Sequence, residues 1–125
     1  MLALDTLRAL RGGEGLKQFE SEVLRCVESV RDPHLANAAR IVRSSLDHAA
    51  SWLAEAQLRG EPALEAGARR FSLTLGRTME LALLIRHAQW SIDHEQDDRA
   101  VSSAHRLALS GVDSIWIGFQ DLQHS

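Results

Sequence analysis

The tripeptide Gly60-Glu61-Pro62 does most to limit what this chain of 125 residues can fold into. Glycine commonly ends a helix, and proline is tolerated in the first helical turn, where its missing N–H has no partner to lose. Asp32-Pro33 gives the same start signal upstream, because an Asp side chain accepts a free N–H of a first turn. We therefore predict one helix from about residue 33 to Gly60 and a second that begins immediately after it.

Apolar residues in both segments recur at spacings of three and four residues, as they do along the seam of a helix bundle. The second pattern lasts until the chain becomes polar at His94 to Asp98. A connection this short makes consecutive helices antiparallel neighbours. The predicted buried positions are Leu35, Ala39, Val42, Leu46, Ala49, Leu53 and Ala56 in the first helix and Leu64, Ala68, Phe71, Leu75, Ala82, Ile85 and Ile92 in the second.

Three further segments flank this helical hairpin. One helix is predicted from about Leu16 to Val30, and another from near Arg99 with apolar positions that continue to Leu122. Residues 1–12 are apolar for their length and are predicted to form a short helix that ends at Gly12-Gly13. Its apolar side chains include Leu4, Leu7 and Leu10.

Composition agrees with this arrangement, since helix-forming residues are plentiful, Tyr is absent and only two prolines occur. A chain of this length buries enough surface to close one core. We expect a single all-α domain over residues 1–125, an antiparallel up-and-down four-helix bundle with the short N-terminal helix added. Gly67 and Gly76, inside the second long helix, are expected to let a neighbouring backbone approach closely.

Charge and cysteine content narrow the classes of partner. The net charge of -3 disfavours strong nonspecific attraction to nucleic acid or anionic lipid. Cys26 is the only cysteine, so an internal disulfide is excluded and a reducing compartment is expected. Asp5 interrupts the N-terminal apolar stretch, and no apolar run approaches the ~20 residues that cross a bilayer. A cytoplasmic location without a membrane anchor is the resulting expectation.

One polar series on the second long helix raises the question of a ligand pocket. Glu80, His87 and His94 recur every seven residues, with Leu83 and Trp90 between them, so that all share one stripe. In one interpretation Glu80 and His87 handle a proton in a pocket between helices and Trp90 forms a wall. Two helical turns separate successive members by ~10 Å, which favours structural or surface roles.

A second series raises the question of nucleic-acid binding. Three arginines fall within the second long helix, and two more would form a stripe on its hairpin partner. Nearby Glu65 and Glu80 dilute this positive charge, so a solvated face with local ion pairs is the favoured interpretation. The arginines are Arg69, Arg70 and Arg77 in the second helix and Arg40 and Arg43 in the first.

Motifs for metal binding and catalysis are incomplete. The Glu-x-x-His pattern of di-iron bundles does not occur, and His94-Glu95 is followed by Asp98 where a zinc-protease signature has its second His. A Gly-x-Ser-x-Gly nucleophile turn and a phosphate-binding loop are also missing. A metal site built from distant residues such as His48 and His105 stays open, but we predict no catalytic, metal-binding or cofactor-binding residue.

The N-terminal string Leu2-Ala3-Leu4-Asp5-Thr6-Leu7-Arg8-Ala9-Leu10 resembles a segment of acyl-CoA dehydrogenase-like flavoproteins of the DNA-alkylation-response (AidB) type. In that family a similar Leu-Asp-x-Leu-Arg-x-Leu stretch follows an aromatic-Glu-Gly-Ser-x-Asn segment and begins the terminal helical domain. The layout of Gly12-Gly13-Glu14, Glu22-Val23 and Ala68-Arg69-Arg70 is broadly similar to that domain. The sharp match covers about ten residues of the chain.

This resemblance implies a C-terminal helical module of an FAD-containing, usually oligomeric protein that sometimes associates with DNA. Met1 stands where the preceding segment would end, so no catalytic or flavin-binding residue of the family transfers to a position here. We expect an accessory domain that is inactive alone and that binds a dehydrogenase body or a second copy. Leu4, Leu7 and Leu10 would dock on such a partner or cap the bundle core. A freestanding nucleic-acid-binding module and a small-ligand bundle are the alternatives.

Overall fold

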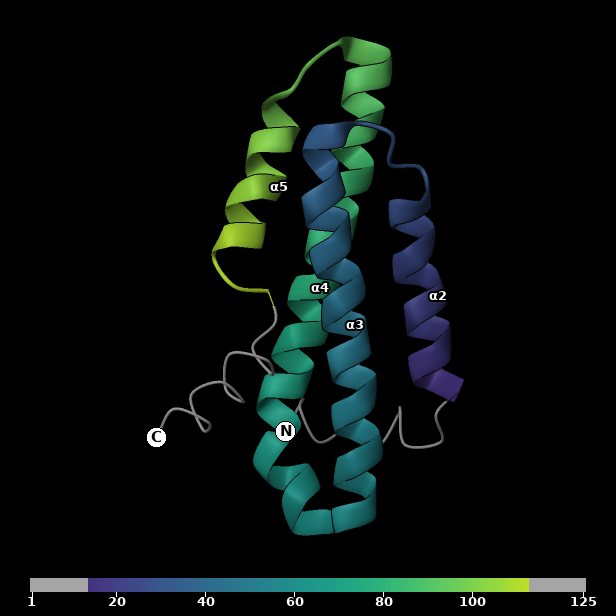
Figure 1. Ribbon diagram of the computed structural model, residues 1–125, viewed down its shortest axis with the longest axis vertical. Coiled ribbons are helices and arrows are strands. Elements are labelled where there is room, and N and C mark those ends of the chain that lie inside the picture. Colours follow the sequence, from purple (N-terminus) through teal and green to yellow (C-terminus); the bar gives the residue numbers. More distant parts are fainter. Residues whose placement is uncertain (1–13, 113–125) are drawn as a thin grey trace.

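The structure is a computed structural model that describes residues 14–112 of the chain. Within that range it forms four helices and no strand, namely α2 (Glu14–Glu28), α3 (Pro33–Arg59), α4 (Glu61–Glu95) and α5 (Arg99–Leu109). Successive helices run in opposite directions, and α2 and α5 lie on opposite sides of the α3–α4 pair (Figure 1). The prediction of an all-α, antiparallel bundle is confirmed. The predicted helix over residues 1–12 lies outside the described residues.

The predicted start signal at Asp32-Pro33 and the predicted corner at Gly60 lie at the two ends of α3. The backbone N–H of His34 donates to Asp32 Oδ1 over 2.7 Å, so Asp32 caps the helix ahead of Pro33. At the other end the N–H of Gly60 donates to the carbonyl of Ala56 over 3.0 Å. Gly60 has a φ of 102°, a conformation that glycine adopts without strain, and α4 begins at the next residue. Local sequence therefore determines this hairpin.

The predicted apolar stripes are the ones that the fold buries. Every predicted seam residue of α3 is buried, and the same is true of α4 apart from Ile92, which is half-buried. In α2, Val23, Cys26 and Val27 are buried and Phe19 is half-buried. Within the described part of the chain, no helix is both long enough and apolar enough to cross a membrane.

The last helix ends earlier than the sequence pattern predicts. The N–H of Ser110 donates to the carbonyls of Arg106 and Leu107, and its hydroxyl also donates to Leu107. Gly111 follows with a φ of 96°, which takes the chain out of the helix. The expectation of one continuous helix through Val112 is therefore wrong, although Val112 is buried. Its expected continuation, with Ile115, Phe119 and Leu122, lies outside the described residues.

The glycines of α4 have different surroundings. A Cβ at Gly67 would lie 2.6 Å from Cε2 of Trp52 on α3, and the Trp52 ring in turn contacts Phe71 with ring centroids 5.1 Å apart. At Gly76 a Cβ would meet no atom within 4 Å. The expectation that a neighbouring backbone approaches both glycines is wrong for both, because a side chain fills the space at Gly67 and the space at Gly76 is open.

The core consists of two apolar clusters. One involves all four helices and includes Val42 and Leu46 of α3, whereas the other lies toward the Gly60 corner and includes Ala49 and Leu53. Three polar residues, Ser45, Thr74 and Thr78, are also buried, and Thr78 lies in sequence between the α4 members of the two clusters. The Thr78 hydroxyl donates to the Thr74 carbonyl over 2.6 Å.

Ser45→Ala is expected to raise the free energy of unfolding by about 1 kcal/mol, because the Ser45 hydroxyl is buried without a hydrogen-bond partner among the described residues. Urea denaturation of the two proteins measures the difference. Ser51→Ala is the matched control, since Ser51 is exposed on the same helix and shares the gain in helix propensity. Equal stabilisation by both substitutions would contradict the explanation by burial.

Candidate functional site

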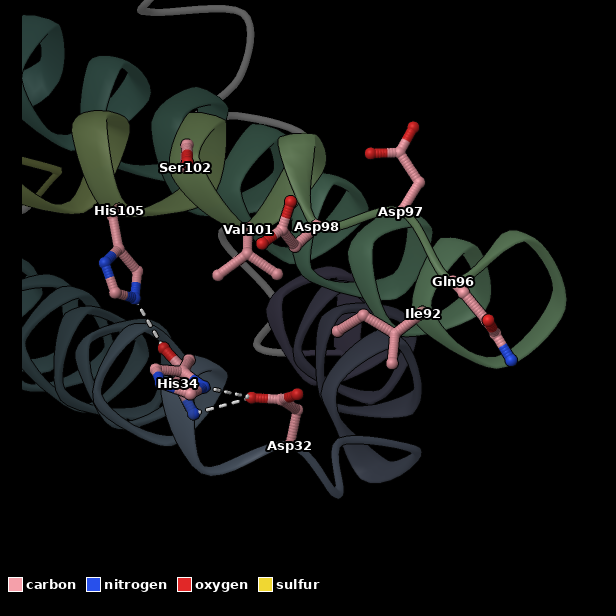
Figure 2. Close-up of a pocket in the computed structure, with 9 residues that line it drawn as sticks. All are labelled: Asp32, His34, Ile92, Gln96, Asp97, Asp98, Val101, Ser102 and His105. Atoms are coloured by element: carbon pink, nitrogen blue, oxygen red, sulfur yellow. Dashed lines mark hydrogen bonds and ion pairs between the residues drawn. The ribbon is translucent and has the colours of Figure 1, made fainter.

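A pocket of about 560 Å³ lies where the start of α3, the end of α4 and the start of α5 meet (Figure 2). Seven of its nine lining residues are polar or charged, and the other two, Ile92 and Val101, are apolar. The lining residues are Asp32, His34, Ile92, Gln96, Asp97, Asp98, Val101, Ser102 and His105.

Helix ends position the polar groups of this pocket. Asp32 is there because it caps α3, and its Oδ1 lies 3.0 Å from Nδ1 of His34. His105 Nε2 of α5 donates to the His34 carbonyl, which fixes α5 against the start of α3 (Figure 2). Gln96 ends α4 in the left-handed conformation with a φ of 55°, and this sharp turn brings Asp97 to the rim. The pocket is thus a product of two chain reversals, the turn before α3 and the turn between α4 and α5.

Acidic side chains outnumber basic ones among the residues that line the pocket. The hydrogen bond from the backbone of His34 lowers the pKa of Asp32. Hydrogen bonds from the Arg99 side chain, and then from its backbone, lower the pKa of Asp97. Among the described residues that line the pocket there are three Asp and no Lys or Arg. No group of three or more His, Cys, Asp or Glu residues within residues 14–112 has a geometry that could hold a metal ion.

Asp32→Asn is expected to reduce the loss of stability at acid pH. The folded-state pKa of Asp32 is lowered, so its stabilising effect is complete at neutral pH and is lost as the pH falls below about 4. Asn still caps a helix but does not titrate in this range. Thermal unfolding between about pH 2 and pH 7 measures this. Asp98→Asn is the control for the loss of one carboxylate, because the Asp98 side chain does not cap α5. An equal change in the pH dependence of both variants would contradict the explanation by capping.

Gln89, which the sequence did not single out, connects two of the chain segments that form the pocket. Its side chain is buried, and Oε1 accepts the backbone N–H groups of Arg31 over 2.9 Å and Asp32 over 3.0 Å. Its Nε2 donates to Asp93 Oδ1 over 3.0 Å, and Arg31 forms an ion pair with the other oxygen of Asp93. This group, which we call the Gln89 clamp, fixes the turn between α2 and α3 to the end of α4.

The residues first considered as pocket lining lie elsewhere. Glu80, His87, Trp90 and His94 are all exposed on α4, and none of them lines the pocket. Trp90 stacks between the two imidazoles, with ring centroids 6.2 Å from His87 and 4.9 Å from His94. His94 Nδ1 also lies 3.0 Å from the Trp90 carbonyl. The structure therefore brings His87, Trp90 and His94 together as an exposed aromatic stack.

These residues belong to a longer exposed face. Helices α2, α3 and α5 all pack against α4, so one face of it is left to solvent. Leu73 and Leu83 are each 43% exposed there, and Trp90 is 48% exposed. We call this face the α4 stripe. Its members are Leu73, Gly76, Glu80, Leu83, His87, Trp90 and His94.

The candidate arginines do not form one continuous surface. Arg69 and Arg70 are exposed, but Arg77 is half-buried and its Nη1 donates to the Gly111 carbonyl over 2.9 Å. Arg77 thus supplies a hydrogen-bond donor to a backbone carbonyl at the point where the chain leaves α5. Nucleic-acid binding by these arginines stays a prediction. Leu4, Leu7 and Leu10 lie outside the described residues.

Comparison with known proteins gives one result. Residues 14–110 match the model of the family described as acyl-CoA dehydrogenase 11 C-terminal domain-like. The match spans more than half of the chain and includes all four described helices. We found no match to the chain among curated proteins or among solved structures.

Proposed function

The chain belongs to the acyl-CoA dehydrogenase 11 C-terminal domain-like family, and from this premise we propose that it is the helical accessory domain of an acyl-CoA dehydrogenase-like flavoprotein. In this role it mediates association, either with a dehydrogenase body or with another copy of itself, and does not catalyse a reaction alone. The observation that carries the proposal is the match over residues 14–110. The finer assignment to the AidB type depends on the string at residues 2–10 and is part of the proposal.

We assign the flavin to the dehydrogenase body. The pyrophosphate of FAD is anionic, and the pocket at the ends of α3, α4 and α5 is a poor fit for it. Three carboxylates line that pocket without a described Lys or Arg among the lining residues, and Arg99 nearby is already paired with Asp97. Repulsion between like charges in a partly enclosed site weakens such binding. In this proposal the chain therefore contributes a helical surface for association and the dehydrogenase body contributes the flavin site.

Co-expression with the acyl-CoA dehydrogenase-like flavoproteins encoded in the same genome, one at a time, tests the proposal. We expect one of them to elute with the chain in gel filtration as a stoichiometric complex that carries flavin absorbance. The purified chain alone should retain no flavin after dialysis against FAD and should not oxidise acyl-CoA. Flavin retention by the chain alone, or the lack of a complex with every such protein, would overturn the proposal.

A further inference from the structure

The α4 stripe contains a glycine that nothing within the described fold explains. Gly76 lies in the middle of a 35-residue helix, where glycine costs about 1 kcal/mol relative to Ala. At Gly67 the ring of Trp52 accounts for the missing side chain, but at Gly76 no atom lies within 4 Å of the Cβ position. The absence of a side chain at Gly76 therefore leaves room for a group outside the described residues 14–112.

The spacing of the stripe is that of a helix that pairs with another helix. Its members alternate at three and four residues over 21 residues, which is the seam spacing of a coiled coil. At 1.5 Å per residue the seam is about 32 Å long. Among the described helices, α2, α3 and α5 all pack against other faces of α4, and Leu73, Leu83 and Trp90 on this face are exposed.

We propose that the α4 stripe binds the α4 stripe of a second copy of this chain, with the two helices antiparallel about a twofold axis between residues 81 and 82. This inference rests on the proposed role of the chain as an interaction domain, and it names the surface and the occupant. In this register Trp90 lies opposite Leu73 of the second copy, and His87 lies opposite Gly76. The imidazole of His87 in each copy thus lies over the space left by the missing side chain at Gly76 in the other copy.

Charge also favours this orientation. A parallel pair would place Glu80 opposite Glu80 and His87 opposite His87, and it would leave a gap where Gly76 faces Gly76. The antiparallel pair places Glu80 one helical turn from His87 of the second copy, within reach of its imidazole. Within one chain, two turns separate Glu80 from His87, about 10 Å along the helix. The twofold axis therefore brings together a pair that one chain keeps apart.

The expected dimer is concentration-dependent. A seam about 32 Å long and about 10 Å wide covers roughly 320 Å² on each copy, less than the ~800 Å² per partner of a standard interface. Sedimentation equilibrium of the full chain over a wide concentration range measures the association. A chain that stays monomeric up to about 1 mM would overturn the proposal.

Substitutions locate the interface. Leu83→Glu is expected to raise the dissociation constant at least about tenfold, because the new carboxylate faces Glu80 of the second copy in this register. The circular dichroism spectrum should stay unchanged, since Leu83 is already partly exposed. Leu58→Glu is the matched control, since Leu58 is 89% exposed on α3 and should leave the association unaltered. Gly76→Gln separates folding from pairing, because it should stabilise the helix and still weaken the dimer. A dimer that survives both stripe substitutions would overturn the assignment of this surface.

Cross-linking with a short bismaleimide tests the orientation. Glu80→Cys should cross-link to its own counterpart, because position 80 lies near the twofold axis. His94→Cys should not, because its counterpart would be about 37 Å away along the helix. Cross-linking at both positions would indicate a parallel pair and overturn the register. Native Cys26 is buried and serves as the unmodified background.

The outcome is separable from that of the proposed function. A monomeric chain that binds a dehydrogenase body, in a complex abolished by Leu83→Glu, would overturn the self-pairing and leave the proposed function intact. The expected dimer and cross-links without any complex with a flavoprotein would support the self-pairing and overturn the role in a dehydrogenase.

Discussion

Gln89→Leu is expected to lower the free energy of unfolding by about 2–4 kcal/mol. Leucine nearly preserves the volume of Gln89 but cannot accept the backbone N–H groups of Arg31 and Asp32, which then lie partly buried without their partner. It also leaves Asp93 without the donor that now binds Oδ1. The turn between α2 and α3 should therefore detach from α4, and the rim of the pocket at Asp32 should move with it.

Urea denaturation measures this loss, and Gln18→Leu is the matched control because Gln18 is exposed on α2 and its replacement should change stability by at most about 0.5 kcal/mol. Gln89→Glu gives a second test. A glutamate accepts both N–H groups, but its carboxylate faces Asp93 without a proton to donate, so this variant should lose stability at neutral pH and regain part of it in acid. Equal stability of the leucine variant and the wild type would show that the clamp contributes nothing.

Gly67→Ala is expected to destabilise the fold by about 2 kcal/mol, because the new methyl group would overlap the indole of Trp52 and force the ring away from Phe71. The same substitution at Gly76 should have the opposite sign. Since a Cβ there meets open space, Gly76→Ala should gain about 0.5–1 kcal/mol from helix propensity alone. One helix therefore contains a site where alanine destabilises and a site where it stabilises.

Chemical denaturation of both variants in dilute solution gives the two signs, and Trp52 fluorescence reports whether the ring has moved. The double variant Gly67→Ala with Trp52→Leu should recover part of the loss, because the smaller side chain leaves room for the methyl group. If alanine stabilised the protein at both positions, the close contact at Gly67 would be of no energetic importance.

The hairpin was predictable because its signals are local. Pro33 and Pro62 are compatible only with the first turn of a helix, and Gly60 supplies the backbone conformation that ends α3. The seam of α3 was predictable for the same kind of reason, since periodic apolar residues on a long helix have one low-energy direction to face. Neither inference requires knowledge of distant parts of the chain.

The Gln89 clamp was not predictable in this way. Gln89 is polar on a helix whose polar residues are mostly exposed, and its role depends on a backbone turn about 57 residues earlier in the sequence. The end of α5 was predicted wrongly for a different reason. Apolar spacing continued through Ser110 and Gly111 and outweighed them in the sequence analysis, although their hydrogen bonds and backbone conformation end the helix at Leu109.

The α4 stripe shows an intermediate case. Seven-residue spacing correctly placed Glu80, His87 and His94 on one face together with Leu83 and Trp90. It did not indicate whether that face points toward the bundle or toward solvent, because α4 is apolar on several sides and contacts three other helices. Only the positions of α2 and α5 decide the matter, and those depend on tertiary packing.

The division of the core into two apolar clusters also bears on how the domain can change in length. Because the apolar cluster toward Gly60 packs mainly within the α3–α4 hairpin, removal of seven residues from each arm there would keep the remaining helix faces in phase. The other cluster and the pocket would stay as they are. Relatives of this chain should therefore vary in length by paired heptads at the tip of the hairpin, while the opposite end keeps a constant size.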